Sequence, residues 1–250
     1  MKILALKFYD NGFMTESFAF GGTRDKNNIK NIRYKSSLQN FLIDDGNEVI
    51  LIDTGLPCDT PDFKKDENAN IFMGDKINTF KEAFDKTGYK ISDVKKIIIT
   101  HKHPDHTGEI KMFSDAKIYI SRLEADQMKL EGDNIIKVDF TAGKFYNFLE
   151  SERITPNLIM IKAPGHTLGN SIVILDDQEN GLFYLFHGDI TYCDAALKNN
   201  ELSVVFEDKD KALDTLSKVR DFIKNNKTIY CSTHCPEGYL NLENKIIQKL

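Results

Sequence analysis

The chain has 250 residues, of which 41% are hydrophobic and 28% charged, proportions that exclude a disordered, collagen-like or membrane-embedded protein. Its 33 basic and 38 acidic residues give a net charge of −5 without a long basic stripe, so we expect no nucleic-acid partner. The apolar runs are far shorter than the roughly 20 residues of a membrane-spanning helix, so we expect no membrane partner. A chain of this length fits one large domain, and we predict a single domain over residues 1–250.

The N-terminal segment and the cysteines bear on location. Charged residues stand early in the first ten positions and no small-residue cleavage site follows, so this segment is typical of a first strand and not of a signal peptide. Four cysteines are too few for a disulfide framework and suit a reducing compartment, which leads us to expect a cytoplasmic protein. The oligomeric state stays open.

Short β-branched runs alternate with longer helical patterns along the whole chain, which indicates an α/β fold. The predicted strands are 3–8, 37–43, 49–52, 96–99, 117–120, 158–162, 171–175, 182–186 and 228–231. Closely spaced strands such as 171–175 and 182–186 suggest antiparallel hairpins, so we expect mixed sheets in preference to a purely parallel one.

Three helices and two irregular segments complete the prediction. A helix is expected over 76–86, another begins after Ser121, whose spacing to Glu124 matches a capping box, and a third spans 209–225. Segments 10–35 and 58–75 lack periodicity, and we expect them to be loops that rim a site.

The most informative segment follows the strand 96–99 and contains three histidines and an aspartate: His101, His103, Asp105 and His106. With this composition, about 0.0005 chance matches to such a pattern are expected in the chain. Imidazole and carboxylate groups are the ligands that zinc and similar metals prefer. Alternate residues of an extended loop share a side, so the first two histidines could reach one ion while Asp105 and His106 turn toward a second.

Further metal ligands should stand at the ends of other strands. His166, Asp189 and His234 each come shortly after a predicted strand. Ligands of open α/β sheets bind outside the ends of strands, so we expect these side chains to converge with the first group.

Together with Asp53-Thr54-Gly55, these motifs and their order resemble those of the metallo-β-lactamase fold superfamily over nearly the whole chain. The resemblance implies a four-layer αβ/βα sandwich of two mixed sheets with two divalent metal ions, zinc in the first place and manganese, iron or cobalt as alternatives. It also implies that Asp53 orients ligand histidines. The implied ligand sets are His101, His103 and His166 for one metal, Asp105, His106 and His234 for the other, and Asp189 as a bridge.

Within the superfamily the chain is most similar to N-acyl-homoserine lactonase-like enzymes. Tyr192 stands three residues after Asp189, where those enzymes carry a tyrosine that contacts the substrate. The resemblance therefore implies a metal-dependent hydrolase of a small-molecule ester or lactone, with Asp105 and Tyr192 as catalytic residues. β-Lactamases of this fold commonly carry Cys or Ser where Asp189 stands, so we do not expect antibiotic hydrolysis.

Other functions stay open. A thioesterase of the glyoxalase II type has the same ligand pattern, and a persulfide dioxygenase would use one iron at His101, His103 and His166. A metal-bearing scaffold without turnover is a third alternative. Residues 168 and 170 are Leu and Asn where many relatives carry Pro and His, which removes no ligand. The complete ligand set leaves no required metal role for the remaining candidates: His187, Cys193, Cys231 and Cys235.

Overall fold

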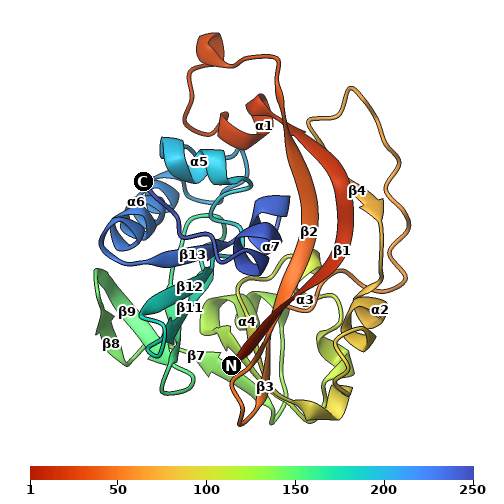
Figure 1. Cartoon of the computed structure of the whole chain (residues 1–250), viewed down its shortest axis with the longest axis vertical. Coiled ribbons are helices and arrows are strands. Elements are labelled where there is room, and N and C mark those ends of the chain that lie inside the picture. The colour runs from red at the N-terminus through yellow and green to blue at the C-terminus, as the bar shows by residue number, and fades with distance from the viewer.

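Two β-sheets pack face to face, and helices cover the outer face of each sheet (Figure 1). The computed structural model describes all residues, 1–250. The strands of the seven-stranded first sheet are, in spatial order, β4 (Ile71–Lys76), β1 (Lys2–Thr15), β2 (Arg33–Asp44), β3 (Val49–Ile52), β5 (Val94–Ile99), β6 (Lys117–Ser121) and β7 (Ile135–Val138). Those of the six-stranded second sheet are β13 (Thr228–Cys231), β12 (Leu182–Phe186), β11 (Ser171–Asp177), β10 (Leu158–Lys162), β9 (Phe148–Arg153) and β8 (Gly143–Phe145).

The helices lie outside the two sheets and at their edges (Figure 1). They are α1 (Glu16–Phe20), α2 (Phe80–Asp85), α3 (Pro104–Thr107), α4 (Arg122–Met128), α5 (Asp194–Asn199), α6 (Lys209–Asn225) and α7 (Pro236–Glu243), with short 3₁₀ turns at Lys26–Asn28, Ile91–Asp93 and Ile110–Met112. Both sheets contain parallel and antiparallel pairs, so the prediction of a four-layer αβ/βα sandwich of two mixed sheets is confirmed.

Three apolar clusters fill the spaces between the four layers. The cluster between the sheets joins both inner faces, and the rings of Phe41 from β2 and Phe186 from β12 lie 5.1 Å apart there. A second cluster packs α2 and α4 on the first sheet, and a third packs the apolar face of α6 on the second sheet. Apolar burial on both faces of each sheet explains why the central strands are almost continuously hydrophobic.

Most central strands were well predicted, and three of the four edge strands were not. β3, β10, β12 and β13 have the predicted bounds, whereas β1 extends to Thr15 and β2 begins at Arg33. The sequence analysis missed β4, β7, β8 and β9, which are edge strands or, for β9, next to the edge. The four missed strands have few buried positions, so their hydrophobic pattern is weak, whereas the edge strand β13 is buried throughout and was predicted. The segments expected to be loops, 10–35 and 58–75, therefore contain parts of β1, β2 and β4 as well as α1.

The predicted helix over 76–86 begins later than expected. Lys76 ends β4, and the helix α2 begins at Phe80 after Thr79, which forms a capping box with Glu82. Ile77 belongs to neither element and is 45% exposed. The cap fixes the first turn, because the hydroxyl and carboxylate together satisfy free amides at the helix start. The helix predicted over 209–225 has the bounds of α6, and Asp208 caps it as expected.

Strand direction brings the candidate ligands to one edge of the sandwich. β3 and β5 are parallel, and in the second sheet β10 and β12 are each antiparallel to β11 while β13 is parallel to β12. The carboxyl ends of β10, β12 and β13 consequently share an edge, and this edge lies beside the carboxyl ends of β3 and β5.

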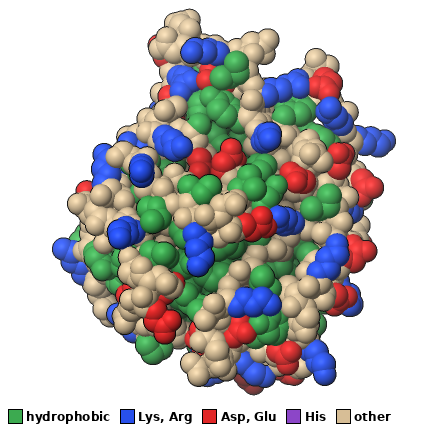
Figure 2. Space-filling view, in the orientation of Figure 1, with side chains coloured by type: hydrophobic (Ala, Val, Ile, Leu, Met, Phe, Trp, Pro, Cys, Tyr) green, Lys and Arg blue, Asp and Glu red, His purple; other side chains and the backbone are tan.

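The charged side chains of one face and the lengths of the helices describe the surface of the molecule. Basic and acidic side chains are interspersed over the face in Figure 2. None of the helices combines the length and the apolar character that crossing a bilayer requires.

The packing of α6 predicts a measurable loss of stability. Leu216 is fully buried in the third cluster, so Leu216→Ala should lower the free energy of unfolding by about 2–5 kcal/mol in urea denaturation. Ser217→Ala, on the exposed face of the same helix, should change it little. Equal effects of the two substitutions would contradict this packing.

Candidate metal centre

The first group of donors lies where β5 leaves its sheet. The chain continues from Ile99 through Thr100 to His101 and His103, and the single turn of α3 then carries Asp105 and His106. Pro104 stands at the first position of α3, where a missing amide hydrogen costs nothing. A strand end followed at once by a helical turn thus gathers four donors within six residues.

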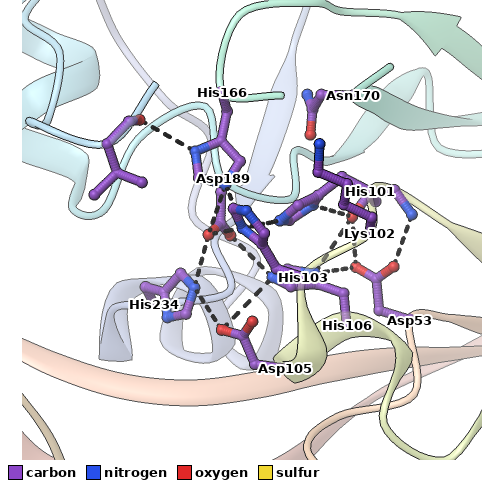
Figure 3. Close-up of polar contacts among 12 residues, drawn as sticks. Asp53, His101, Lys102, His103, Asp105, His106, His166, Asn170, Asp189 and His234 are labelled. Atoms are coloured by element: carbon purple, nitrogen blue, oxygen red, sulfur yellow. Dashed lines mark hydrogen bonds and ion pairs between the residues drawn. The ribbon is translucent and has the colours of Figure 1, made fainter. Parts of the chain in front are cut away.

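The second group comes from the other sheet. His166 lies in the connection from β10 to β11, Asp189 follows β12, and His234 follows β13. Figure 3 shows these three side chains pointing toward those of the first group. The structure therefore brings together all seven residues that the sequence singled out as metal ligands.

The seven side chains form two clusters that share Asp189. In the first cluster, Nε2 of His101 and Nε2 of His166 lie 3.1 Å and 3.0 Å from Nδ1 of His103. Oδ2 of Asp189 lies 3.5 Å from the nitrogen of His166 and 4.0 Å from that of His101. Three ring nitrogens and a carboxylate thus converge on one point.

The second cluster contains two imidazoles and two carboxylates. Asp189 reaches both histidines, with Oδ1 3.1 Å from Nε2 of His106 and Oδ2 3.0 Å from Nε2 of His234. Oδ2 of Asp105 lies 3.4 Å from the same nitrogen of His234 and 3.9 Å from that of His106. Oδ2 of Asp189 therefore faces both clusters, and Oδ1 faces the second.

The donor set fits divalent cations. In the first cluster, two facing ring nitrogens can form a hydrogen bond only where one of them carries a proton, and a cation would instead be coordinated by the lone pairs of the three neutral rings. Zinc, with bonds of ~2.0 Å at tetrahedral angles, separates its nitrogen ligands by roughly 3.3 Å, close to the spacing found here. In the second cluster, Nε2 of His106 and Oδ1 of Asp189 are buried and lie 3.1 Å from one another, and neither atom has a hydrogen-bond partner elsewhere. Both would be satisfied by a cation.

Asp53 holds the rings of this centre in place from the end of β3. Its Oδ2 lies 2.7 Å from Nδ1 of His106, which leaves Nε2 of that ring directed at Asp189. The same carboxylate accepts hydrogen bonds from the amide and hydroxyl of Thr100, at 2.8 Å and 2.9 Å. The Thr100 hydroxyl lies 3.1 Å from Nδ1 of His101. Asp53 therefore contacts His106 directly and His101 through Thr100.

Burial and neighbouring charge set the protonation of the donors. Burial lowers the pKa of His166 to about 4 and, with the neighbouring His106 and His166, lowers that of His101 well below its usual range. Burial opposes a charge on His106 too, but Asp189, Asp53 and Asp105 outweigh it and raise the pKa of that ring. Burial would raise the pKa of Asp189, yet His234 and His106 hold it well below its usual range. Metal binds neutral imidazoles and ionised carboxylates. The lowered pKa values of His101, His166 and Asp189 therefore favour binding, whereas the raised pKa of His106 means that a cation there competes with a proton.

Tyr192 lies at the same centre. Its hydroxyl donates to Oδ2 of Asp189 at 3.0 Å, and its ring stacks on His234 at 4.8 Å with an angle of 14° between the planes. Phe18 of α1 meets the tyrosine ring edge-on at 5.0 Å. The first irregular segment of the sequence therefore does contact the candidate site, as expected.

Backbone hydrogen bonds join the two sheets at this edge. The amides of Ser37 and Gln39 in β2 donate to the carbonyls of His234 and Thr233, both at 3.1 Å. On the other side, the amide and hydroxyl of Ser171 in β11 donate to the carbonyl of Thr100, at 2.9 Å and 3.0 Å. These bonds fix the His234 loop and the start of the His101 loop to the opposite sheet.

The remaining histidine and the cysteines stand apart from both clusters. His187 is fully buried and stacks on Tyr230, with ring centroids 4.2 Å apart. Three cysteines pack in apolar clusters, and burial raises the pKa of each thiol, to about 12 for Cys193. Neither donor cluster contains a cysteine.

The sequence analysis missed two residues that contact the site loops. It did not identify Thr100 as a link between Asp53 and His101, although its place between the strand and the first histidine is a signal. It also placed Glu124 only in a capping box. The Ser121 hydroxyl does accept a hydrogen bond from the amide of Glu124, but the Glu124 carboxylate does not return to the helix start. It accepts instead from the amides of Lys102 and Gly169.

Comparisons with known proteins agree with this geometry. Residues 39–222 match the family model of the metallo-beta-lactamase superfamily. An N-acyl homoserine lactonase from Bacillus cereus is 26% identical over 211 residues, which cover 78% of this chain and 79% of the relative.

Solved structures share the fold. An N-acyl homoserine lactone hydrolase with the product N-hexanoyl-L-homoserine at its catalytic metal center superposes with a TM-score of 0.71 at 17% identity, covering 99% of this chain and 96% of the other. AidC, a dizinc quorum-quenching lactonase, superposes with a TM-score of 0.65 at 16% identity, covering 94% and 86%.

The loop after β12 approaches the loop after β5 closely at Gly188 and Thr100, and this contact yields a stability prediction. Gly188 has φ +57°, and a Cβ there would lie 2.9 Å from the hydroxyl of Thr100, whereas Gly181 has φ +62° and open space around it. Gly181→Ala should cost about 1–2 kcal/mol through its backbone alone. Gly188→Ala should cost more, because Thr100 must also move. Denaturant unfolding of chelator-treated protein measures both, and equal losses would contradict a tight contact at Gly188.

Proposed function

The chain belongs to the metallo-β-lactamase superfamily, and on that premise we propose that it is a hydrolase that uses two divalent metal ions to cleave a carboxylic ester or lactone. The observation that carries the proposal is the pair of four-residue donor clusters that share Asp189. The names of the relatives favour an N-acyl-homoserine lactone as the substrate class.

We assign the ligands by cluster. His101, His103 and His166 would hold one ion, Asp105, His106 and His234 the other, and Asp189 would bridge them. Mixed imidazole and carboxylate donors suit zinc first, with manganese, iron and cobalt as alternatives. A dizinc lactonase among the structural neighbours supports the pair of zinc ions.

Bound divalent ions supply two effects, a lowered pKa for water and polarisation of a carbonyl oxygen. Hydrolysis then requires that a water oxygen bond to the acyl carbon, that the bond from this carbon to the leaving oxygen break, and that a proton reach the leaving oxygen. Asp105 is suited to carry that proton, because its side chain is 18% exposed while the other donors of its cluster are almost fully buried.

Tyr192 is suited to bind the substrate at the reacting group. Its hydroxyl is already directed at Asp189, and a small rotation of that bond would let it donate to a substrate oxygen on which negative charge develops. The rings of Phe18 and His234 hold the tyrosine ring on two sides. The hydroxyl is therefore oriented before substrate binds, which lowers the cost of reaching the transition state.

Elemental analysis together with a substrate panel tests the proposed function. We expect about two zinc-like ions per chain and hydrolysis of a lactone in preference to a thioester or a β-lactam. Removal of metal by a chelator should abolish turnover, and added zinc, manganese, cobalt or iron should restore it. Faster thioester hydrolysis would favour the glyoxalase II type, and a single iron with oxygen consumption on persulfide would favour a dioxygenase. Turnover that survives complete metal removal would exclude all three.

Two substitutions separate metal binding from substrate chemistry. His106→Ala removes a donor and the partner of Asp53, so the metal content should fall below that of the wild type. Tyr192→Phe keeps the ring between Phe18 and His234 and removes only the hydroxyl, so metal content should stay while kcat falls by about 10- to 1,000-fold. Equal metal loss in both variants would show that Tyr192 belongs to the metal-binding shell.

A further inference from the structure

A buried carboxylate beside the metal centre is not explained by the donor clusters. Glu124 lies in the first turn of α4 and is fully buried. Its Oε2 accepts a hydrogen bond from the amide of Lys102 at 2.8 Å, and its Oε1 accepts one from the amide of Gly169 at 2.9 Å. Each oxygen thus binds the backbone of a different loop.

These two loops carry the donors of the first cluster. Lys102 stands between His101 and His103 on the loop after β5, and Gly169 lies three residues after His166 on the loop between β10 and β11. The first loop leaves one sheet and the second belongs to the other. A single side chain therefore spans the sandwich at the place where the three histidines meet.

The contact with the His166 loop is close. A Cβ at Gly169 would lie 2.5 Å from Oε1 of Glu124 and 2.7 Å from the hydroxyl of Ser121, so only glycine fits there without displacement. The Ser121 hydroxyl also donates to the carbonyl of Gly169 at 2.7 Å. The start of α4 thus binds both the amide and the carbonyl of one residue in the ligand loop.

A second carboxylate joins the same loops from outside. Glu207 accepts a hydrogen bond from the amide of Leu168 at 2.7 Å, and its other oxygen pairs with Nζ of Lys102 at 2.5 Å. This pair is partly exposed, so solvent weakens it. Of the two carboxylates, Glu124 is the one that is shielded from water. Hydrogen bonds from amides to a carboxylate are stronger than those between neutral groups.

We propose that Glu124 is a positioning residue that sets the separation of His101 and His103 from His166, and thereby the affinity of that cluster for its metal ion. The inference rests on the proposed function, because it presupposes that the clusters bind metal. The effect should be confined to one site. The donors of the second cluster are held by other contacts, His106 by Asp53 and the His234 loop by Ser37 and Gln39.

The substitution Glu124→Gln tests the proposal with the least change in shape. A glutamine side chain keeps one acceptor, but its amide group must face an N–H donor of Lys102 or Gly169, so one of the two bonds is lost. We expect the zinc affinity of one site to fall by about 10- to 100-fold and that of the other to stay, as measured by competition with a chromogenic chelator. With Co²⁺ as the probe, only one of the two sets of absorption bands should shift.

Asp126→Asn is the matched control. Asp126 lies in the same helix but is exposed, and it pairs with Lys137 at 2.8 Å, away from both loops. Both zinc affinities should equal those of the wild type. Gly169→Ala disturbs the same contact from the opposite loop, and it should reproduce the loss at one site if the glutamine variant does not fold.

The outcomes are distinguishable. A wild-type protein that binds none of zinc, manganese, iron and cobalt would overturn the proposed function. A wild type with two zinc ions and a Glu124→Gln variant with both affinities unchanged would overturn only the positioning role. A parallel fall of both affinities would also overturn it, because that result indicates a general loss of structure and not the placement of one cluster.

Discussion

The carboxylate of Asp189 is the group on which the arrangement of the site depends. It is buried, and it meets His106 at 3.1 Å, His234 at 3.0 Å and the hydroxyl of Tyr192 at 3.0 Å. An isolated carboxylate in such a place would cost several kcal/mol of folding free energy, and only opposing charges and donors offset that cost. The histidines supply this compensation, and the lowered pKa of Asp189 is its consequence. Each histidine that faces Asp189 is in turn buried, so the charges of the centre are mutually dependent.

Such a centre can form only if the strand ends of the two sheets lie at the same edge of the sandwich and one sheet is displaced little relative to the other. The donors after β5 belong to one sheet, and those after β10, β12 and β13 belong to the other. Apolar packing between sheets is non-directional and leaves this offset loosely determined. The hydrogen bonds from Ser37 to His234 and from Ser171 to Thr100 are directional and cross the boundary at the donors themselves. They restrict the spacing between the two sheets that packing alone leaves free.

The contrast between apolar packing and directional hydrogen bonds explains which parts of the structure could be predicted from the sequence. Buried strands such as β3, β10 and β12 are short apolar runs, and their ends could be read from the sequence because polarity changes abruptly where burial stops. The donors could be named for the same reason, since each stands just beyond such an end. The strands β4, β7 and β8 lie at sheet edges and lack that signal. The contacts of Thr100 and Glu124 could not be predicted, because they depend on which loops lie side by side after folding.

The departures from local sequence rules occur where the site needs them. Glu124 occupies the position of a capping box, yet its carboxylate serves two loops and leaves the helix start with the Ser121 hydroxyl alone. Asp53 adopts φ +64°, a conformation that costs a residue with a side chain about 1–2 kcal/mol. Three contacts offset this cost, two with Thr100 and one with His106. In both cases a local preference, the capping box at Glu124 and the ordinary backbone conformation at Asp53, is given up while the carboxylate contacts amides or rings of the loops that carry the donors. The local strain and the order of the metal centre therefore have the same cause.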